Sequence, residues 1–181
     1  MATIRRKCFI SYHHADQEAV NQFVRDFDHD SDCFIARGLG EEMTDDIIDS
    51  MNTDYVMSQI RKRFLSNSTV TIVLLGRCTW SRRYVDWEIQ SSLRQGKGTT
   101  PNGLLGVKLP SYPSKGGTFP KRFNDNLKSE GQIDCYARHM PYPSSTQALI
   151  NAIEAAYDRR TTHAHLIVNP RDRMGYNRQC K

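Results

Sequence analysis

The sequence contains no long apolar run. The longest, residues 70–75, is interrupted by Thr71 and is far shorter than the roughly 20 residues that a membrane helix needs. The basic residues 5–7 are followed neither by an apolar segment of the signal-peptide kind nor by a small-residue cleavage site. We therefore expect no transmembrane span, no secretory signal and a cytoplasmic protein.

Several common cofactor motifs are also missing. A dinucleotide-binding turn needs glycines after the first strand, where residues 11–14 read Ser-Tyr-His-His. The Gly-Lys pair in residues 96–99 lacks the Ser or Thr that completes a phosphate-binding loop, and residues 75–77 lack the Asp of a phosphoacceptor site. No Cys-x-x-Cys pair occurs, and the closely spaced histidines have no partners of metal-ligand spacing. We expect no metal site.

The composition fits one folded domain. Hydrophobic residues make up 38% of the 181 residues, charged residues 25%, and the mean hydropathy is −0.62, so the chain can bury a core. The net charge of +5 is concentrated near the ends of the chain. We predict a domain over residues 1–160 and a basic C-terminal extension over 161–181. A solvated basic tail is favoured over nucleic-acid binding, because no aromatic-basic ladder accompanies the charge.

The cysteines give no sign of a disulfide framework. They are odd in number and widely spaced, and most lie in strand-like apolar runs. We interpret all five as reduced, partly buried thiols: Cys8, Cys33, Cys78, Cys135 and Cys180.

Short apolar runs predict five strands. They cover residues 7–12, 33–36, 69–75, 106–109 and 133–136. The third run is nearly all apolar, as expected for a central strand covered on both faces, and the fifth is of the edge type.

Apolar residues at helical spacing predict helices between these strands. The helices run from an N-cap at Asp16 to residue 27 and over 56–64, 85–93 and 149–157, with a weak segment over 123–127. We expect Thr79 or Ser81 to cap the helix over 85–93, and Ser144 or Ser145 to cap the last helix.

Five alternations of strand and helix predict an α/β fold of the flavodoxin-like kind, an open parallel five-stranded sheet flanked by helices. Ligands of such sheets bind outside the carboxyl ends of the strands. The candidate site segments are therefore residues 11–16, the acidic loop over 38–51, and residues 76–88.

The helix over 85–93 begins with the strongest chemical pattern. Ser81, Tyr84 and Glu88 are spaced i, i+3 and i+7, which predicts one shared helical face. A carboxylate beside aromatic surface can be desolvated and can contact sugar hydroxyls or a developing oxocarbenium ion, as cleavage of a glycosidic bond requires. An ordinary surface glutamate fits the spacing as well.

These residues resemble the TIR domain family. The resemblance rests on residues 9–12 (Phe-Ile-Ser-Tyr) with Asp16, on the acidic loop, and on Ser-x-x-Tyr-Val-x-x-Glu over 81–88. The family usually carries Ser-x-x-Trp-Cys-x-x-Glu there, so Tyr84 and Val85 are departures. Residues 82–88 are most similar to the TIR-like domain of bacterial Thoeris antiphage defence.

The resemblance implies an NAD glycohydrolase or ADP-ribosyl cyclase. Such an enzyme breaks the bond between nicotinamide and ribose of NAD, which is its substrate, and needs no cofactor. The product would be a cyclic or otherwise modified ADP-ribose, a signal that activates an effector protein in antiphage defence. The further partners implied are a second copy of the chain and a phage-derived trigger.

The resemblance also implies roles for single residues. Glu88 would be catalytic, holding the ribose hydroxyls and stabilising positive charge. Tyr12 would stack on nicotinamide, with packing against a helix as its alternative. His13 or Arg37 would meet the pyrophosphate, with a solvated loop position as the alternative for each. The whole substrate-binding set is Ser11, Tyr12, His13, Arg37, Ser81 and Tyr84.

Two further points stay open. Trp80 and Trp87 offer faces for adenine, although a tryptophan at such positions more often packs in the structure. A non-catalytic TIR module that works by self-association or adaptor binding through the loop over 38–51 is the alternative function. Glu88 argues against this alternative, and the departure at Tyr84 keeps it open.

Overall fold

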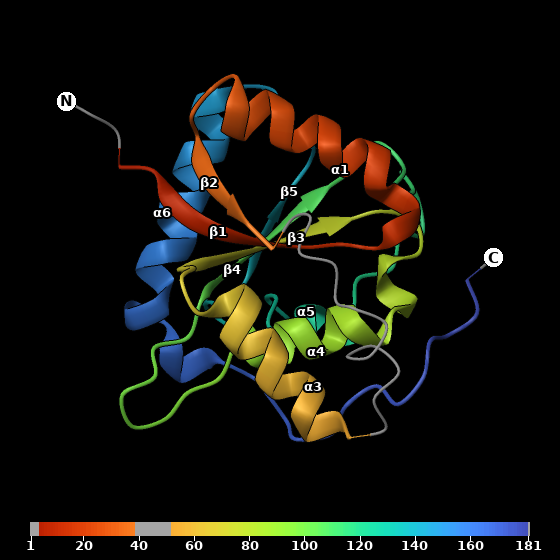
Figure 1. Cartoon of the computed structure of the whole chain (residues 1–181), viewed down its shortest axis with the longest axis vertical. Helices are drawn as coiled ribbons and strands as arrows, with labels where there is room; N and C mark the ends of the chain where they lie inside the picture. Colours follow the sequence, from red (N-terminus) through yellow and green to blue (C-terminus); the bar gives the residue numbers. More distant parts are fainter. Residues whose placement is uncertain (1–3, 39–51, 181) are drawn as a thin grey trace.

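A computed structural model describes residues 4–38 and 52–180. Five parallel strands form one sheet in the order β2-β1-β3-β4-β5 (Figure 1), which is the doubly wound order of flavodoxin-like folds. The predicted fold class is confirmed. The strands are β1 (Arg6–Ser11), β2 (Phe34–Arg37), β3 (Val70–Leu75), β4 (Gly103–Lys108) and β5 (Arg138–Met140).

Helices cover both faces of the sheet. In Figure 1, α1 and α6 lie on one side of the strands, and α3, α4 and α5 lie on the other. None of the helices in the described ranges combines the length and apolarity needed to cross a membrane. The α-helices are α1 (Gln17–Val24), α3 (Thr53–Gln59), α4 (Arg83–Ser92), α5 (Lys121–Asn124) and α6 (Thr146–Thr162). The remaining helical segments are η1 (His14–Asp16), η2 (Arg25–His29), η3 (Ile60–Leu65), η4 (Thr79–Ser81) and η5 (Ala164–Leu166).

Alternation along β1 determines which side chains face which helices. Cys8 and Ile10 belong to the core under α1 and α6, whereas Phe9 packs with Val56 of α3 and Trp87 of α4. Successive side chains of a strand point to opposite faces, so Ser11 shares the face of Phe9. The strand therefore ends with a polar residue directed at the layer that contains α4.

The fifth strand lies further along the chain than predicted. The run over 133–136 is a loop, and residues Arg138–Met140 pair with β4 instead. Ile133 is 96% exposed, whereas Tyr136 is buried and its hydroxyl donates to the carbonyl of Asn102 at 2.7 Å. The apolar residues over 133–136 predict a strand, but the buried one among them, Tyr136, lies in a loop. The edge strand β5 itself begins with the polar residues Arg138 and His139.

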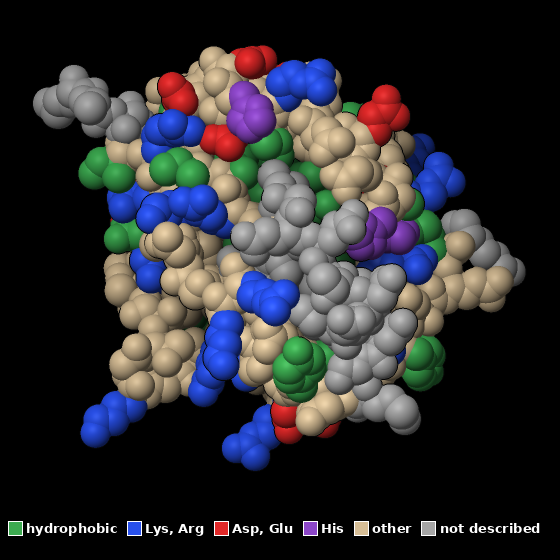
Figure 2. Space-filling model, in the orientation of Figure 1, with side chains coloured by type: hydrophobic (Ala, Val, Ile, Leu, Met, Phe, Trp, Pro, Cys, Tyr) green, Lys and Arg blue, Asp and Glu red, His purple; other side chains and the backbone are tan. Residues whose placement is uncertain are grey.

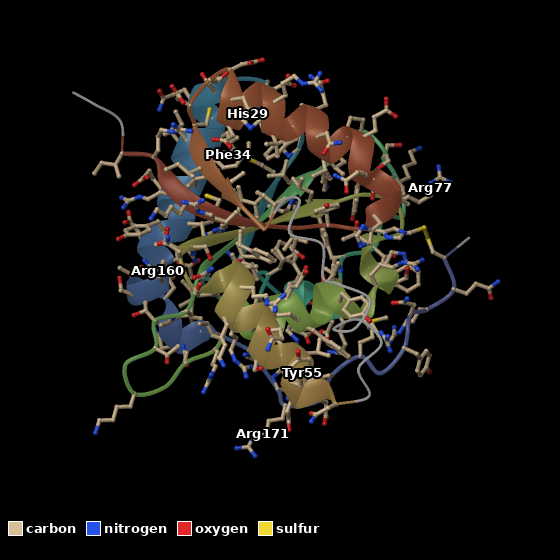
Figure 3. The ribbon with its side chains drawn as sticks, viewed as in Figure 1. His29, Phe34, Tyr55, Arg77, Arg160 and Arg171 are labelled. Atoms are coloured by element: carbon tan, nitrogen blue, oxygen red, sulfur yellow. A yellow bond between two sulfur atoms is a disulfide. The ribbon has the colours of Figure 1, made fainter. Side chains whose placement is uncertain are left out.

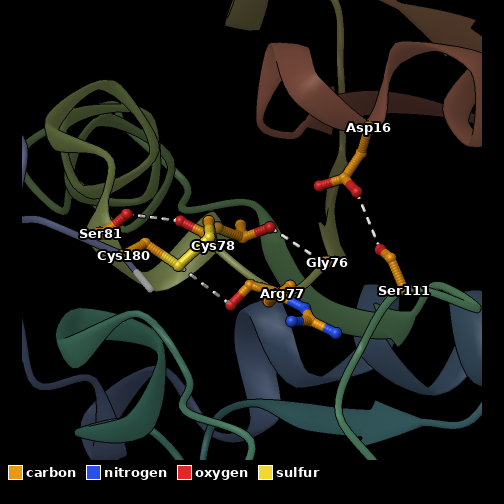
Figure 4. Close-up of a disulfide and its surroundings, with 8 residues drawn as sticks. Asp16, Gly76, Arg77, Cys78, Ser81, Ser111 and Cys180 are labelled. Carbon is orange, nitrogen blue, oxygen red and sulfur yellow. Dashed lines mark hydrogen bonds between the residues drawn. A yellow bond between two sulfur atoms is a disulfide. The ribbon is translucent and has the colours of Figure 1, made fainter.

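The predicted cap residues stand at the N-terminus of two helices, α1 and α6, and are wrong for α4. Ser145 caps α6 by accepting a hydrogen bond from the Ala148 amide at 3.2 Å. Asp16 stands at the N-cap position of α1, but its carboxylate accepts from the Ser111 hydroxyl at 2.8 Å instead (Figure 4). Neither Thr79 nor Ser81 caps α4, because both lie in the preceding turn η4 and the helix begins at Arg83.

Two of the five cysteines are not thiols. Cys78 and Cys180 form a disulfide with a Cα–Cα distance of 5.7 Å (Figure 4), so the interpretation of five reduced cysteines is wrong for this pair. The other three, Cys8, Cys33 and Cys135, are free and buried, as expected. The bonded pair is 102 residues apart in the sequence, a separation that carries no local signal.

The C-terminal strap, residues 167–180, is not a solvated tail. Its backbone runs along α4 and is held there by the indole of Trp87, which donates to the Met174 carbonyl at 2.9 Å. The Arg178 amide donates to the Ser81 carbonyl at 2.9 Å, next to the disulfide. The basic side chains of Arg171 and Arg178 are nevertheless exposed. The division into 1–160 and 161–181 stays a prediction.

We expect Gly103→Ala to destabilise the fold. A Cβ at Gly103 would overlap the backbone carbonyl of Ala156 in α6, and backbone cannot move aside as a flexible side chain can. The expected loss in the free energy of unfolding is about 2–3 kcal/mol, measured by urea denaturation. Gly96→Ala is the control, because nothing lies within 4 Å of that position. Equal stability of the two variants would contradict this close approach.

Candidate active site

Glu88 and Ser11 meet at the carboxyl end of β1. Ser11 is the last residue of the strand and is fully buried, and Glu88 lies in the middle of α4. The Ser11 hydroxyl donates to Oε2 of Glu88 at 2.5 Å. Carboxyl ends of parallel strands are where ligands bind in this architecture, so the pair stands at the expected place for a site.

A chain of hydrogen bonds holds the Glu88 backbone against the central strands. The Ser92 hydroxyl donates to the Glu88 carbonyl at 2.8 Å, and its oxygen lies 2.7 Å from Oγ1 of Thr71 in β3. The Asn102 amide donates to the same Thr71 oxygen at 3.2 Å. Because Thr71, Ser92 and Asn102 are all buried, α4 has little freedom to slide on the sheet.

The Glu88 carboxyl titrates far above its usual range. Burial raises its pKa to about 8, and the hydrogen bond from Ser11 opposes this rise. Glu88 as a whole residue is only half-buried, so the carboxyl is desolvated by surrounding protein in a residue that solvent still touches. A carboxyl in this state gains most from a ligand that brings positive charge, because that charge favours the ionised form.

His13 and Arg82 add a positive charge near the end of β1. Burial lowers the pKa of His13, and the nearby positive charge of Arg82 lowers it further. His13 is therefore neutral at pH 7 and suits hydrogen bonding, while Arg82 is the cation beside it. The Nε atom of Arg82 is buried and has no hydrogen-bond partner among the described residues. Such an unmet donor is available to an anionic ligand.

Arg82 is not among the site residues predicted from the sequence. Asp86 stands at i+4 from Arg82, where it resembles an ordinary helical ion-pair partner. In the structure Asp86 is paired with Arg122 instead, at 2.8 Å. Since that pairing joins residues 36 positions apart, local spacing could not reveal that Arg82 is left without its apparent partner.

Tyr12 is placed by packing. Its hydroxyl donates to Oε1 of Gln17 at 2.7 Å, and its ring meets His14 edge-on at 6.0 Å. Part of the residue lies against the core under α1. These contacts agree with the packing alternative, and stacking on nicotinamide stays a prediction.

Tyr84 and Arg37 come from different elements, the first turn of α4 and the end of β2. The Tyr84 hydroxyl accepts from Arg83 at 2.8 Å, and its ring packs edge-on against Trp87 at 5.4 Å. Arg37 is exposed at the end of β2, in register with Phe9. The loop that follows it falls outside the described residues from position 39 onward. Substrate contacts of Tyr84 and Arg37 stay predictions.

The predicted face shared by Ser81, Tyr84 and Glu88 does not form, because Ser81 precedes the helix. Its buried hydroxyl donates to the Cys78 carbonyl at 2.7 Å, so a substrate contact by Ser81 stays a prediction. Trp87 is buried beneath the C-terminal strap and offers no open face to adenine.

Trp80 and Arg82 both line a cavity of about 630 Å³ between η4, α5 and the strap. Glu88 and Ser11 are not among the residues that line this cavity. In the described part of the chain, no group of three His, Cys, Asp or Glu side chains is arranged to hold a metal ion.

A five-stranded parallel sheet of this order, with helices on both faces, is the flavodoxin-like architecture to which TIR-like domains belong. A family model described as "Thoeris protein ThsB, TIR-like domain" matches residues 9–113, which is more than half of the chain. The chain belongs to this family.

A curated relative from Bacillus cereus (strain MSX-D12) carries the name "Putative cyclic ADP-D-ribose synthase ThsB1". It is 30% identical over 79 residues, a match that covers 44% of this chain and 34% of the relative. The matched region is thus about a third of the relative's length.

Proposed function

We propose that this chain cleaves the bond between nicotinamide and ribose of NAD at the Glu88–Ser11 pair. The observation that carries the proposal is the desolvated Glu88 carboxyl at the carboxyl end of β1, fixed by Ser11 at 2.5 Å. The name of the relative, which refers to cyclic ADP-D-ribose synthesis, supports the same chemistry.

The reaction needs a negative charge beside the ribose. The C1′–N bond breaks with its electron pair going to nicotinamide, which leaves neutral, and positive charge develops on the ribose. An ionised Glu88 stabilises that charge and accepts hydrogen bonds from the ribose hydroxyls. A hydroxyl or ring nitrogen of the substrate, or water, then forms a bond to C1′ and loses its proton. The nucleophile determines whether the product is cyclic, conjugated or hydrolysed.

The pyrophosphate of NAD requires donors and positive charge at the same end of the sheet. Arg82, with its unmet Nε donor, supplies the charge, and neutral His13 supplies a hydrogen bond. This assignment adds Arg82 to His13 and Arg37, the two residues that the resemblance implies for the pyrophosphate. Arg37 stays a second candidate at the exposed end of β2.

In the cell, we propose that the product is a signal in antiphage defence. The family is named after Thoeris, and a modified ADP-ribose would reach an effector protein by diffusion. A phage-derived trigger and self-association would control when the enzyme acts.

The direct test uses the purified full chain incubated with NAD, alone and with lysate from phage-infected cells. Nicotinamide release is followed by chromatography, and the second product by mass spectrometry. We expect nicotinamide and an ADP-ribose-derived species in equal amounts. No release under either condition, from folded protein, would overturn the proposal in favour of the adaptor alternative.

The pH dependence follows from the raised pKa of Glu88. Since the ionised carboxylate is the active form, kcat/KM should rise with pH and level off above about 8. Ser11→Ala removes a hydrogen bond that favours the carboxylate, so the rising limb should move to higher pH. Steady-state assays between pH 6 and pH 10 check both profiles. A Ser11→Ala limb at lower pH would contradict the assignment.

A further inference from the structure

A second cavity, of about 490 Å³, lies where the C-terminal strap crosses the end of α4. Four arginines line it: Arg61 from η3, Arg94 just after α4, and Arg171 and Arg173 from the strap. None of its described lining residues is acidic. Figure 2 shows Lys and Arg side chains along α3 and below it, on the side where Figure 3 labels Arg171.

The positive charge of this cavity is largely uncompensated. Arg173 donates to the Gln90 side chain at 2.8 Å and lies 3.5 Å from the carboxylate of Asp54, which is 91% exposed. In the described part of the chain, the guanidinium groups of Arg61, Arg94 and Arg171 have no hydrogen bond or ion pair. Burial, followed by the charges of Arg94 and Arg173, lowers the pKa of Arg61. The cations are therefore close enough to repel one another.

The walls of the cavity are held in place independently of these charges. The side-chain amide of Gln90 donates to the backbone carbonyls of Pro170 at 3.0 Å and Arg171 at 3.2 Å. The Asn169 amide donates in return to the Gln90 carbonyl at 3.1 Å. The strap is thus fixed to α4 beside the arginines, and the cavity is formed before any ligand arrives.

The chemistry of the lining selects the class of ligand. Guanidinium groups match phosphate oxygens with paired, charge-assisted hydrogen bonds. No aromatic residue lines the cavity, so there is no platform on which a nucleic-acid base could stack. We propose that this cavity binds a small anion carrying two or more adjacent phosphate groups. The proposal does not depend on the proposed function, because Glu88 and Ser11 are not among the lining residues.

The test is calorimetric titration of the full chain with inorganic pyrophosphate at constant ionic strength. We expect saturable binding with one site per chain. Arg94→Gln with Arg171→Gln should weaken binding at least about 30-fold, since each removes charge-assisted contacts to phosphate. Both side chains are exposed and unpaired in the described structure, so the double variant should fold. Its melting temperature without anion should be equal to or above that of the wild type, because repulsion is relieved.

The matched control removes two exposed charges outside the cavity, Arg63→Gln with Lys97→Gln, and should change affinity by less than about twofold. Arg82→Gln should bind pyrophosphate as the wild type does, because Arg82 is assigned to the pyrophosphate of NAD and does not line this cavity. This variant separates the cavity from the proposed substrate site. Absence of saturable binding would overturn the proposal. An equal loss in the control pair, or tighter binding of a single-stranded oligonucleotide that depends on the same arginines, would also overturn it.

Discussion

Glu88→Gln should lower the rate of nicotinamide release from NAD by at least about 10³-fold. Glutamine keeps the size of the side chain and can still accept the hydrogen bond from Ser11. It cannot carry the negative charge that stabilises the developing positive charge on ribose. The measurement is kcat/KM for nicotinamide release at pH 9, where the wild-type carboxyl is ionised.

The same variant should be more stable than the wild type at high pH. The folded-state pKa of Glu88, about 8, lies above the ordinary value of 4.5, so stability is lost as the pH rises between these values. Glutamine removes that loss, and the melting temperatures should diverge between pH 5 and pH 9. Glu18→Gln, at an exposed position in the first turn of α1, is the matched control for both measurements. Activity of Glu88→Gln within threefold of the wild type would contradict a catalytic role.

Arg122→Leu should lower the free energy of unfolding more than any other substitution proposed for this protein. Arg122 is 4% exposed and pairs with Asp86 at 2.8 Å. It also donates to the Pro170 carbonyl at 2.8 Å and to the Asp172 carbonyl at 2.5 Å. Removing one partner of a buried pair costs about 3–5 kcal/mol, because the other charge stays buried. Chemical denaturation measures this loss directly.

The strap should loosen in the same variant. Its carbonyls at Pro170 and Asp172 lose their donor, so trypsin should cut after Arg171 or Arg173 faster than in the wild type. Lys121→Leu is the control, since Lys121 is exposed and its pair with Asp125 is a surface contact worth less than about 1 kcal/mol. Equal stability and equal cleavage of the two variants would show that Arg122 does not hold the strap.

The strands of the sheet could be predicted from the sequence where the buried, apolar residues are also the residues of the strand. The apolar, β-branched run that forms β3 is buried on both faces, and such a run has few alternatives to a central strand. At the edge of the sheet this link fails. Arg138 and His139 of β5 are exposed. The neighbouring Tyr136, which lies in a loop, is buried, and its hydroxyl donates a hydrogen bond to the Asn102 carbonyl. Hydrophobicity therefore identified the wrong segment.

The candidate site was predictable to the extent that it depends on single residues. Glu88 and Ser11 belong to motifs of the family, and the structure brings them within hydrogen-bonding distance. The residues around this pair are positioned by contacts between residues that are far apart in the sequence. Asp86 binds Arg122, which leaves Arg82 without its apparent helical partner, and Cys78 is bonded to Cys180 across most of the chain. No local spacing encodes such contacts.

The C-terminal strap connects the two proposed sites through α4. Its backbone is tied to Trp87 and Gln90, and Glu88 lies on the same helix between these two residues. The basic residues that dominate this part of the sequence thus line a cavity, while the backbone that carries them supports the helix of the candidate active site. The composition of the sequence reveals the positive charge of the strap, but it does not reveal that the strap's backbone supports α4.

The decisive experiment on the role of Glu88 is mass spectrometry of small molecules from cells that express the wild type or Glu88→Gln, with and without phage infection. It tests the activity and its trigger together. We expect an ADP-ribose-derived species that accumulates in the wild type and is absent from Glu88→Gln. No such species under any condition, with folded protein present in the cells, would contradict this expectation and favour the adaptor alternative.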